Sequence, residues 1–338
     1  MRFVVFSDVH LHYWRHVSVA RQVLALYDVL DYCKVQGIET LLFCGDFFHT
    51  HGNLKTELVH HFHRWLEAVA ENNLRLLAIA GNHDFGDRSG SANGLWAINL
   101  LPKGGLLSQA TFPVVQVDDL PICGVTYMED QDDLRDRLAS VPSDSVLLLH
   151  QGVSGVELNS KGFTLNEILT PDMIPDRVLH AFSGHYHTTK YVSHNLTIPG
   201  ALIQHTWQDA PDARGFLDVK VDGQRVHLRH VPSKFGDNFR VMSYEEYLRA
   251  PEDQRHSRNL KVVGVPDEAT AAGIEVGDRP SMGRTIVAEV RERTAAIPED
   301  FAESSLSSRA LFEQYIATRG LSDVYIETGK RIVEGKNP

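Results

Sequence analysis

Short apolar runs alternate with longer amphipathic segments in the N-terminal part of the chain. The runs Phe3 to Phe6, Leu41 to Cys44 and Leu76 to Ala80 have the length and composition of buried strands. Between them, Val17 to Cys33 and Thr56 to Ala70 carry apolar residues at helical spacing. This order of strand, helix, strand and helix is the signature of a parallel or mixed sheet covered by helices.

The pattern changes after residue 111, where short strands are predicted at 114–117 and 122–125. Farther along, the apolar stretches 216–219 and 226–230 flank Asp222-Gly223, which is a strong hairpin signal. Two sheets packed face to face, with the helices outside, would satisfy this pattern. The sequence therefore predicts an α/β fold.

A second, smaller unit is predicted after a linker at Pro232 to Phe239. A strand at Leu260 to Val265, a helix at Asp267 to Ala272 and a strand at Thr285 to Arg291 make a small βαβ unit. We therefore place a large domain at residues 1–234 and a small domain at residues 235–297.

The last part of the chain, residues 298–338, is predicted to be a tether and a helix. Residues 298–308 are polar and Ser-rich, which is typical of a flexible tether. Ser308 could cap the helix, and Gly320 would stop it. The helix carries an apolar stripe of the kind that binds a groove on a partner, formed by Leu311, Phe312, Tyr315 and Ile316. The alternative is that this helix packs back on the small domain.

Composition and cysteine usage indicate a globular cytoplasmic protein. Hydrophobic residues make up 43% of the chain and charged residues 23%, both ordinary values. No apolar run approaches the ~18 residues of a membrane span, and the N-terminus carries no signal-peptide pattern. Cys33, Cys44 and Cys123 are odd in number and unevenly spaced, so we expect reduced, buried thiols rather than disulfides or a zinc site.

Five polar motifs follow predicted strands and carry the candidate chemistry. Loops at the carboxyl ends of buried strands converge in open α/β folds, so these motifs could form one cleft. Their donors are Asp oxygen, His nitrogen and Asn oxygen without Cys, a mixture that suits Mn²⁺, Fe²⁺ or Zn²⁺. In chain order the motifs are Asp8-Val9-His10, Gly45-Asp46, Gly81-Asn82-His83-Asp84, His150 and Gly184-His185-Tyr186-His187.

Each motif taken singly has a structural alternative. Asp8 and Asp46 could cap strand ends, and Asn82 could belong to an ordinary turn. His83 makes its motif more specific, because a turn needs the Gly and the Asn but not the His. The ordered set, with each member at a strand end, favours a functional site over five independent coincidences.

The set resembles the calcineurin-like metallophosphoesterases, and within them the SbcD-type nuclease subunits of double-strand-break repair complexes, especially the phage recombination-endonuclease branch. Gly45-Asp46-Phe47-Phe48-His49 matches the Gly-Asp-x-x-His of that branch, whereas Ser/Thr protein phosphatases carry Gly-Asp-x-x-Asp-Arg-Gly there. Residues 198–201 and 212–216 resemble the phage-type continuation. The resemblance covers about residues 1–235 and implies a four-layer α/β/β/α sandwich, followed by a small α/β capping domain and a helical partner-binding segment.

The resemblance implies two Mn²⁺ ions per chain, with Mg²⁺, Fe²⁺ or Zn²⁺ as alternatives. One ion would be held by Asp8, His10 and His187. The other would be held by Asn82, His150 and His185, and Asp46 would bridge the two. Paired metals of this kind activate a shared water and stabilise charge on the attacked phosphate.

Catalytic roles are implied for two further histidines. His83 resembles the His that contacts the scissile phosphate and protonates the leaving oxygen, a task that suits imidazole because it titrates near neutrality. His49 resembles the additional His that places the substrate or His83, although His51 lies close enough in sequence to be confused with it. Asp84 is expected to orient His83 or to cap the next segment.

Other polar residues near the motifs are weaker candidates. Arg88 and Lys190 directly follow motifs and could meet substrate phosphates, although exposed charge is the default interpretation. His205 and Trp207 are expected on the surface, with lining of the cleft as the alternative. The row His60, His61 and His63 is expected to form a solvated helix face, as these residues cannot all reach one metal.

The function implied is a two-metal DNA nuclease subunit with 3′-to-5′ exonuclease and single-strand endonuclease activity. Its implied partners are DNA, an SbcC-type SMC-like ATPase and a second copy of the chain. The alternatives are a stand-alone phosphoesterase acting on nucleotides or cyclic nucleotides, and a scaffold that has lost its metals. The net charge of −11 weighs against an extended DNA surface, so either basic residues cluster only in the fold or a partner carries part of the DNA grip.

Overall fold

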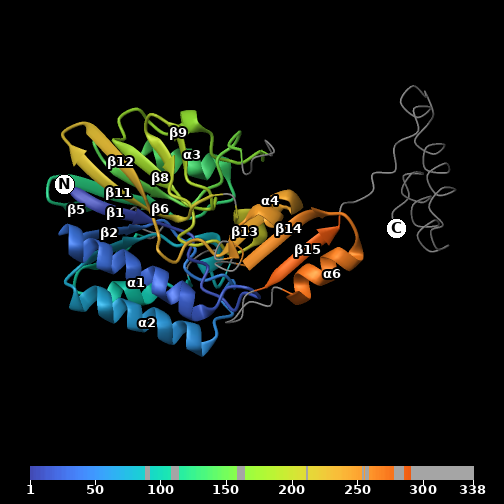
Figure 1. Cartoon of the computed structure of the whole chain (residues 1–338). Coiled ribbons are helices and arrows are strands. Elements are labelled where there is room, and N and C mark those ends of the chain that lie inside the picture. Colours follow the sequence, from blue (N-terminus) through green and yellow to red (C-terminus); the bar gives the residue numbers. More distant parts are fainter. Residues whose placement is uncertain are drawn as a thin grey trace, which may run out of the picture. The chain divides into compact units, whose positions relative to one another are not determined.

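The computed structural model describes residues 1–87, 92–107, 114–157, 164–210, 212–252, 255, 259–277 and 285–290. Two six-stranded sheets form the large part of the molecule (Figure 1). The predicted helix with the stripe Leu311, Phe312, Tyr315 and Ile316 lies outside the described residues, as does Arg88.

The first sheet has the strand order β12-β11-β1-β2-β3-β4. Strands β1 to β4 run parallel, and β11 pairs antiparallel with both β1 and β12. Their bounds are β1 Arg2–Phe6, β2 Thr40–Phe43, β3 Arg75–Ala78, β4 Gly104–Leu106, β11 Gly215–Asp222 and β12 Arg225–Pro232. The hairpin predicted at Asp222-Gly223 is confirmed, with Asp222 paired to Arg225.

The second sheet has the order β5-β6-β7-β8-β10-β9. Its four inner strands run parallel, and the outer two pair antiparallel with their neighbours. Their bounds are β5 Val114–Val117, β6 Leu120–Val125, β7 Val146–Leu149, β8 His180–Ser183, β9 Lys190–Ser193 and β10 Leu196–Ile198. The strands predicted at 114–117 and 122–125 are therefore confirmed.

Helices cover the outer faces of the two sheets, α1 and α2 on one side and α3 on the other (Figure 1). Helix α1 (Val19–Gln36) begins after Ser18, whose side chain accepts a hydrogen bond from the Arg21 N–H, and ends at Gly37, whose φ is 65°. Helix α2 spans Thr56–Glu71 and α3 spans Gln131–Ala139. The two helices predicted in the N-terminal part of the chain, 17–33 and 56–70, are confirmed as α1 and α2, whereas α3 was not predicted. Short 3₁₀ helices are η1 Asn82–Asp84, η2 Trp96–Leu100, η3 Pro171–Met173 and η4 Trp207–Asp209.

Three apolar cores separate these four layers. Strand β1 contributes to two of these cores, because successive side chains of a strand point to opposite faces of the sheet. Phe3 and Val5 pack between the two sheets, whereas Val4 and Phe6 pack under α1 and α2. A third core lies between the second sheet and α3. The predicted four-layer α/β/β/α sandwich is the observed fold.

A parallel three-stranded sheet, β13-β14-β15, follows the sandwich in the chain. Its elements are β13 Phe239–Ser243, α4 Tyr244–Arg249, β14 Asn259–Val265, α6 Glu268–Gly277 and β15 Ile286–Val290. The predicted βαβ unit is present, and β13 adds an unpredicted strand because Phe239 is buried rather than part of a linker. One of the contacts of this sheet with the sandwich is made by His16, whose carbonyl accepts a hydrogen bond from Asn259 Nδ2 at 3.0 Å. The proposed domain boundaries stay predictions.

Two other expectations concern the thiols and membrane spans. Cys33, Cys44 and Cys123 are buried and not joined in disulfides, as predicted. No helix in the described part of the chain is both long and apolar enough to cross a bilayer.

Candidate metal centre

The five motif loops leave the carboxyl ends of β1, β2, β3, β7 and β8 and meet at one edge of the two sheets. Their glycines allow this close approach. A Cβ on Gly81 would lie 2.2 Å from Asp46 Oδ1, and one on Gly184 would lie 2.3 Å from Ser7 Oγ. Gly45 is equally confined and also has a φ of 93°. The glycines of these motifs are therefore required by space, independently of any turn preference.

The backbone of the candidate ligands is unusual. Asp8, His10, Asp46 and His185 have φ values of 52°, 46°, 60° and 82°, in the left-handed region that non-glycine residues avoid. Such conformations cost about 1–3 kcal/mol each and cluster at functional sites. Here these backbone conformations turn the side chains that follow β1, β2 and β8 toward one point.

Three donors gather on one side of this point. Asp8, His10 and His187 offer ligand atoms that all lie within 4.8 Å of one another. His10 Nε2 lies 3.7 Å from Asp8 Oδ1 and 3.5 Å from Asp46 Oδ2. The three residues predicted to hold the first ion are therefore together, and Asp46 is beside them.

A second set of donors also gathers around Asp46. His150 Nε2 is 3.2 Å from Asp46 Oδ2, and His185 Nδ1 is 3.2 Å from Asn82 Oδ1. The centroids of the His150 and His185 rings are 5.4 Å apart. Asp46 Oδ2 thus lies within 3.5 Å of both His10 Nε2 and His150 Nε2, which suits a carboxylate that would bridge two ions.

The donor set fits a pair of divalent cations. His150 Nε2 is fully buried, points at Asp46 and makes no hydrogen bond, whereas its Nδ1 bonds to the Cys44 carbonyl at 2.6 Å. A buried ring nitrogen that makes no hydrogen bond lowers the stability of the fold, unless it binds a ligand. The bond to Cys44 fixes the ring orientation, as expected for a metal-binding histidine.

Electrostatics keep the carboxylates ionised and several imidazoles neutral. Burial opposes ionisation of Asp8, but the neighbouring His10, His150 and His187 hold its pKa below the usual range. Asp46 behaves in the same way, with its pKa lowered by His150 and His10 against the effect of burial. Burial lowers the pKa of His10 and takes that of His185 to about 4. In contrast, and against the effect of burial, the charge of Asp46 raises the pKa of His150 to about 9, and Asp209 and Asp8 raise that of His187. Metals bind anionic carboxylates and neutral imidazoles, so these two rings would release a proton when a metal binds.

Asp84 fixes the loop that carries Asp46. Its carboxylate accepts hydrogen bonds from the backbone N–H groups of Asp46, Phe47, Phe48 and Gly81 at 2.8–3.1 Å. It is buried, and burial together with the charge of Asp46 raises its pKa to about 7. Asp84 therefore orders the second motif, whereas the sequence had suggested that it orients His83 or caps the next segment.

His83 is clamped between two other histidine rings. The ring centroids of His49 and His51 lie 4.9 Å and 4.3 Å from its own, at interplanar angles of 13° and 28°. His83 Nδ1 bonds to the His49 carbonyl at 2.7 Å. This contact leaves Nε2 as the ring nitrogen for other partners. His49 Nδ1 in turn lies 3.3 Å from His10 Nδ1, so both His49 and His51 are placed to position His83.

A buried ion pair behind His187 was not predicted from the sequence. Asp209 Oδ1 lies 3.4 Å from His187 Nδ1 and accepts a hydrogen bond from Arg214 Nη2 at 3.0 Å. Arg214 Nη1 also donates to the His187 carbonyl at 2.6 Å. This carboxylate–histidine arrangement orients the ring and raises its basicity. The only sequence signal was the acid and the arginine in the stretch after the last motif.

Replacing Asp209 by asparagine is expected to weaken binding of one metal equivalent about 10- to 100-fold, the usual cost of losing such a partner of a ligating histidine. Calorimetric titration with Mn²⁺ measures it, and Asp176→Asn, an exposed acid near His194, serves as the control. Unchanged affinity at both equivalents in a folded variant would show that Asp209 only caps η4.

His205 belongs to the centre and was wrongly expected on the surface. It is buried, and its ring centroid lies 5.5 Å from that of His10 and 5.7 Å from that of His187. Burial and the neighbouring His10 lower its pKa well below the usual value, so the ring is neutral. Trp207 packs against Phe239 of the small sheet and is not among the residues that line the cleft.

The structure places Lys190 at the start of β9, half-buried and paired in the sheet with Ile198. Its proposed contact with phosphate stays a prediction, as does that of Arg88, which lies outside the described residues. His60 and His63 are exposed on α2, as expected for a solvated face.

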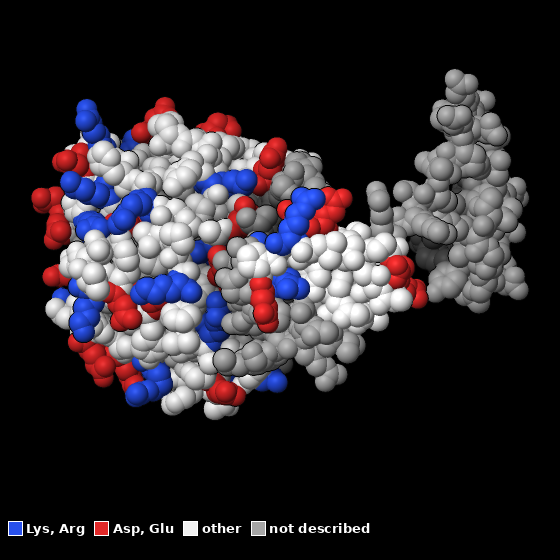
Figure 2. Space-filling model, viewed as in Figure 1, with Lys and Arg blue, Asp and Glu red and all other residues white. Residues whose placement is uncertain are grey.

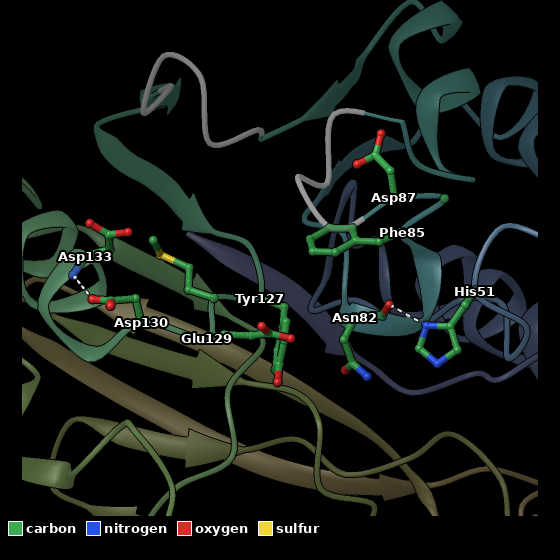
Figure 3. Close-up of a pocket in the computed structure, with 10 residues that line it drawn as sticks. His51, Asn82, Phe85, Asp87, Tyr127, Glu129, Asp130 and Asp133 are labelled. Atoms are coloured by element: carbon green, nitrogen blue, oxygen red, sulfur yellow. Dashed lines mark hydrogen bonds between the residues drawn. The ribbon is translucent and has the colours of Figure 1, made fainter.

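A cleft of about 590 Å³ opens beside the centre (Figure 3). Asn82, Phe85 and His51 border it from one side, and Tyr127 and Glu129 border it from the other. Asn82 belongs both to the proposed donor set and to the cleft wall, so the cleft lies directly beside the candidate centre.

Comparison with known proteins identifies a relative in sequence and several similar solved structures. The chain is 24% identical over 395 residues to the DNA double-strand break repair protein Mre11 of Methanopyrus kandleri, a match covering 99% of this chain and 82% of that protein.

Solved structures overlap with the chain more loosely. GAP50, the anchor in the inner membrane complex of Plasmodium, is 13% identical with a TM-score of 0.46, over 70% of this chain and 86% of its own. TT1561 of Thermus thermophilus is 11% identical with a TM-score of 0.43, over 68% and 98%. The phosphoesterase Yfce from E. coli is 14% identical with a TM-score of 0.35, over 70% and 96%.

The sequence profile described as calcineurin-like phosphoesterase matches residues 1–249, which include the whole sandwich and every candidate ligand described above. This chain therefore belongs to the calcineurin-like phosphoesterases, a family of two-metal phosphoester hydrolases.

Proposed function

We propose that the chain is a DNA nuclease that hydrolyses phosphodiester bonds with two divalent ions, as a 3′-to-5′ exonuclease and a single-strand endonuclease. The observation that carries the proposal is the extent of the match to the Methanopyrus repair protein. That match spans 99% of this chain, whereas the phosphoesterase profile ends at residue 249. A nucleotide phosphatase has no need of the remaining chain.

In this proposal Asp8, His10 and His187 would hold one ion, Asn82, His150 and His185 would hold the other, and Asp46 would be shared by the two. Mn²⁺ is the proposed metal, although the donors also suit Mg²⁺, Fe²⁺ or Zn²⁺. When bound, such a pair supplies a nucleophilic hydroxide near neutral pH and neutralises charge on the phosphate.

The chain's own residues then position and protonate the substrate. His83 keeps Nδ1 on the His49 carbonyl, so its Nε2 is the nitrogen that can approach a phosphate oxygen. We propose that this nitrogen donates a proton to the leaving oxygen. The flanking His49 and His51 rings restrict His83 to one orientation, which preserves the geometry that proton transfer requires.

The surface charge supports a partner in DNA binding. On the face drawn in Figure 2, Lys and Arg side chains are interspersed with Asp and Glu and do not gather in one basic patch. The net charge is −11. We propose that an SbcC-type ATPase and a second copy of the chain supply part of the DNA grip, with the stripe at residues 311–316 docking on the ATPase.

The alternative is a phosphoesterase that acts on nucleotides or cyclic nucleotides. The metal centre would serve either substrate, because both present a phosphoester to the same pair of ions. The alternative leaves the C-terminal residues 250–338 without a role.

The two functions are separated by offering both substrates to one preparation of the full chain with Mn²⁺. We expect a labelled single-stranded oligonucleotide to be shortened while 2′,3′- and 3′,5′-cyclic nucleotides stay intact. Excess EDTA should stop the cleavage, and Asp176→Asn should leave it unchanged. Hydrolysis of the cyclic nucleotides with intact DNA would establish the alternative instead.

A further inference from the structure

The cleft beside the metal centre has the size of a binding site for a small molecule. Its volume of about 590 Å³ lies within the range of ~300–1,000 Å³ for such sites. It is lined by the loop after β3, from Asn82 to Asp87, and by the segment from Tyr127 to Asp133 that leads into α3 (Figure 3). A phosphate at the metals would have this cleft next to it on the Asn82 side.

Two aromatic rings line the cleft and are held in place by the fold. Phe85 is half-buried, packs against the core under α1 and α2, and pairs through its backbone with Asn93. Tyr127 stacks on the ring of His185, with centroids 5.9 Å apart and planes 26° apart. Rigid, uncharged rings of this kind are surfaces on which nucleobases stack.

The remaining polar groups of the cleft are unsuited to a phosphate backbone. Four carboxylates line it, those of Asp87, Glu129, Asp130 and Asp133, and none of the ten described residues that line it is Lys or Arg. Carboxylates accept hydrogen bonds from the amino groups of bases and repel phosphates. The cleft therefore combines a surface on which a base can stack with negative charge. This charge would repel the phosphates of a DNA strand that continued through the cleft.

We propose that this cleft receives the terminal nucleoside of a DNA strand, with its base against Phe85 and Tyr127 and the acidic residues blocking the next phosphate. The inference rests on the proposed nuclease function and assigns its cutting register. With one nucleoside between the metals and the acidic wall, the bond presented for hydrolysis is the one next to the strand end. This register applies to the exonuclease reaction, whose products are then mononucleotides.

The test compares two single-stranded oligonucleotides that differ only at the cleaved 3′ end, where one carries a base and the other an abasic residue. We expect wild-type kcat/KM to favour the base-bearing end about 5- to 150-fold, the range that stacking on an aromatic side chain supplies. In Phe85→Leu, which keeps an apolar side chain, this ratio should fall toward one. A ratio measured within one variant is independent of how much of the protein is folded.

Tyr191→Leu is the matched control, because Tyr191 is an exposed aromatic residue on β9 that does not line the cleft. It should keep the wild-type ratio. A wild-type ratio near one, or an unchanged ratio in Phe85→Leu, overturns the pocket while leaving the nuclease proposal standing. If the wild type cuts neither oligonucleotide, the nuclease proposal fails, and the pocket fails with it.

A second arm tests the acidic wall through product length. The double variant Glu129→Gln, Asp133→Asn removes two charges and leaves Asp130, which caps α3, in place. We expect dinucleotides and longer fragments to appear among the products, because a strand can then continue past the cleft. Unchanged release of mononucleotides alone would refute the role given to these acids.

Discussion

Asp46→Asn is expected to lower Mn²⁺-dependent cleavage by about 10³-fold or more, because metal catalysis supplies several kcal/mol of transition-state stabilisation. Asn keeps the size of the side chain and the oxygen that accepts from the His83 N–H at 2.9 Å. It loses the second charged oxygen, Oδ2, which faces His10 Nε2 and His150 Nε2. The bridge between the two proposed ions is thereby removed with little change in packing.

Calorimetry on the same variant separates loss of metal from loss of fold. We expect fewer than two tight Mn²⁺ equivalents and a metal-free melting temperature close to that of the wild type. Asp176→Asn removes an exposed acid and should change neither quantity. Full cleavage by Asp46→Asn, or by the wild type in excess EDTA, would contradict the bridging role.

His83→Ser is expected to reduce turnover about 10²- to 10⁴-fold, the usual contribution of general acid–base catalysis. His83 makes its ring contacts with His49 and His51 and its Nδ1 contact with the His49 carbonyl. These contacts hold the ring beside the proposed metal ligands, and His83 is not itself one of them. The variant should therefore still bind two Mn²⁺ equivalents by calorimetry.

The matched control is His60→Ser, which removes an exposed histidine of α2. It should leave both turnover and metal content as in the wild type. If His83→Ser instead loses a metal equivalent, then His83 is a ligand. The cluster of His10, His49 and His83, whose nitrogen atoms lie within 4.8 Å of one another, would be the place to look for that ion.

The parts of this site that the sequence predicted are those carried by local patterns. Apolar runs located the strands, and the residue after each strand end, such as Asp8 or Asp46, is placed at the shared edge by the fold itself. Helices α1 and α2 were predictable because their buried residues recur at helical spacing. The motif glycines can also be recognised in the sequence, although the structure requires them because another loop approaches each of them closely.

The parts that the sequence did not predict depend on contacts between distant segments. Asp209 and Arg214 become a support of His187 only when η4 packs behind the last motif. His205 is buried beside His10, although the two residues are far apart in the sequence. Asp84 was expected to act on its neighbour His83, but the fold offers it four backbone donors from two loops, which satisfy a buried carboxylate better.

The central claim is that two ions share the Asp46 carboxylate, and electron paramagnetic resonance of the Mn²⁺-loaded full chain tests it most directly. Two Mn²⁺ ions joined by a bridging carboxylate are magnetically coupled, whereas separate ions give the six-line signal of isolated Mn²⁺. We predict a coupled signal at two equivalents per chain that is lost in Asp46→Asn. A six-line spectrum that persists at two equivalents, or saturation at one equivalent, would contradict the two-metal centre.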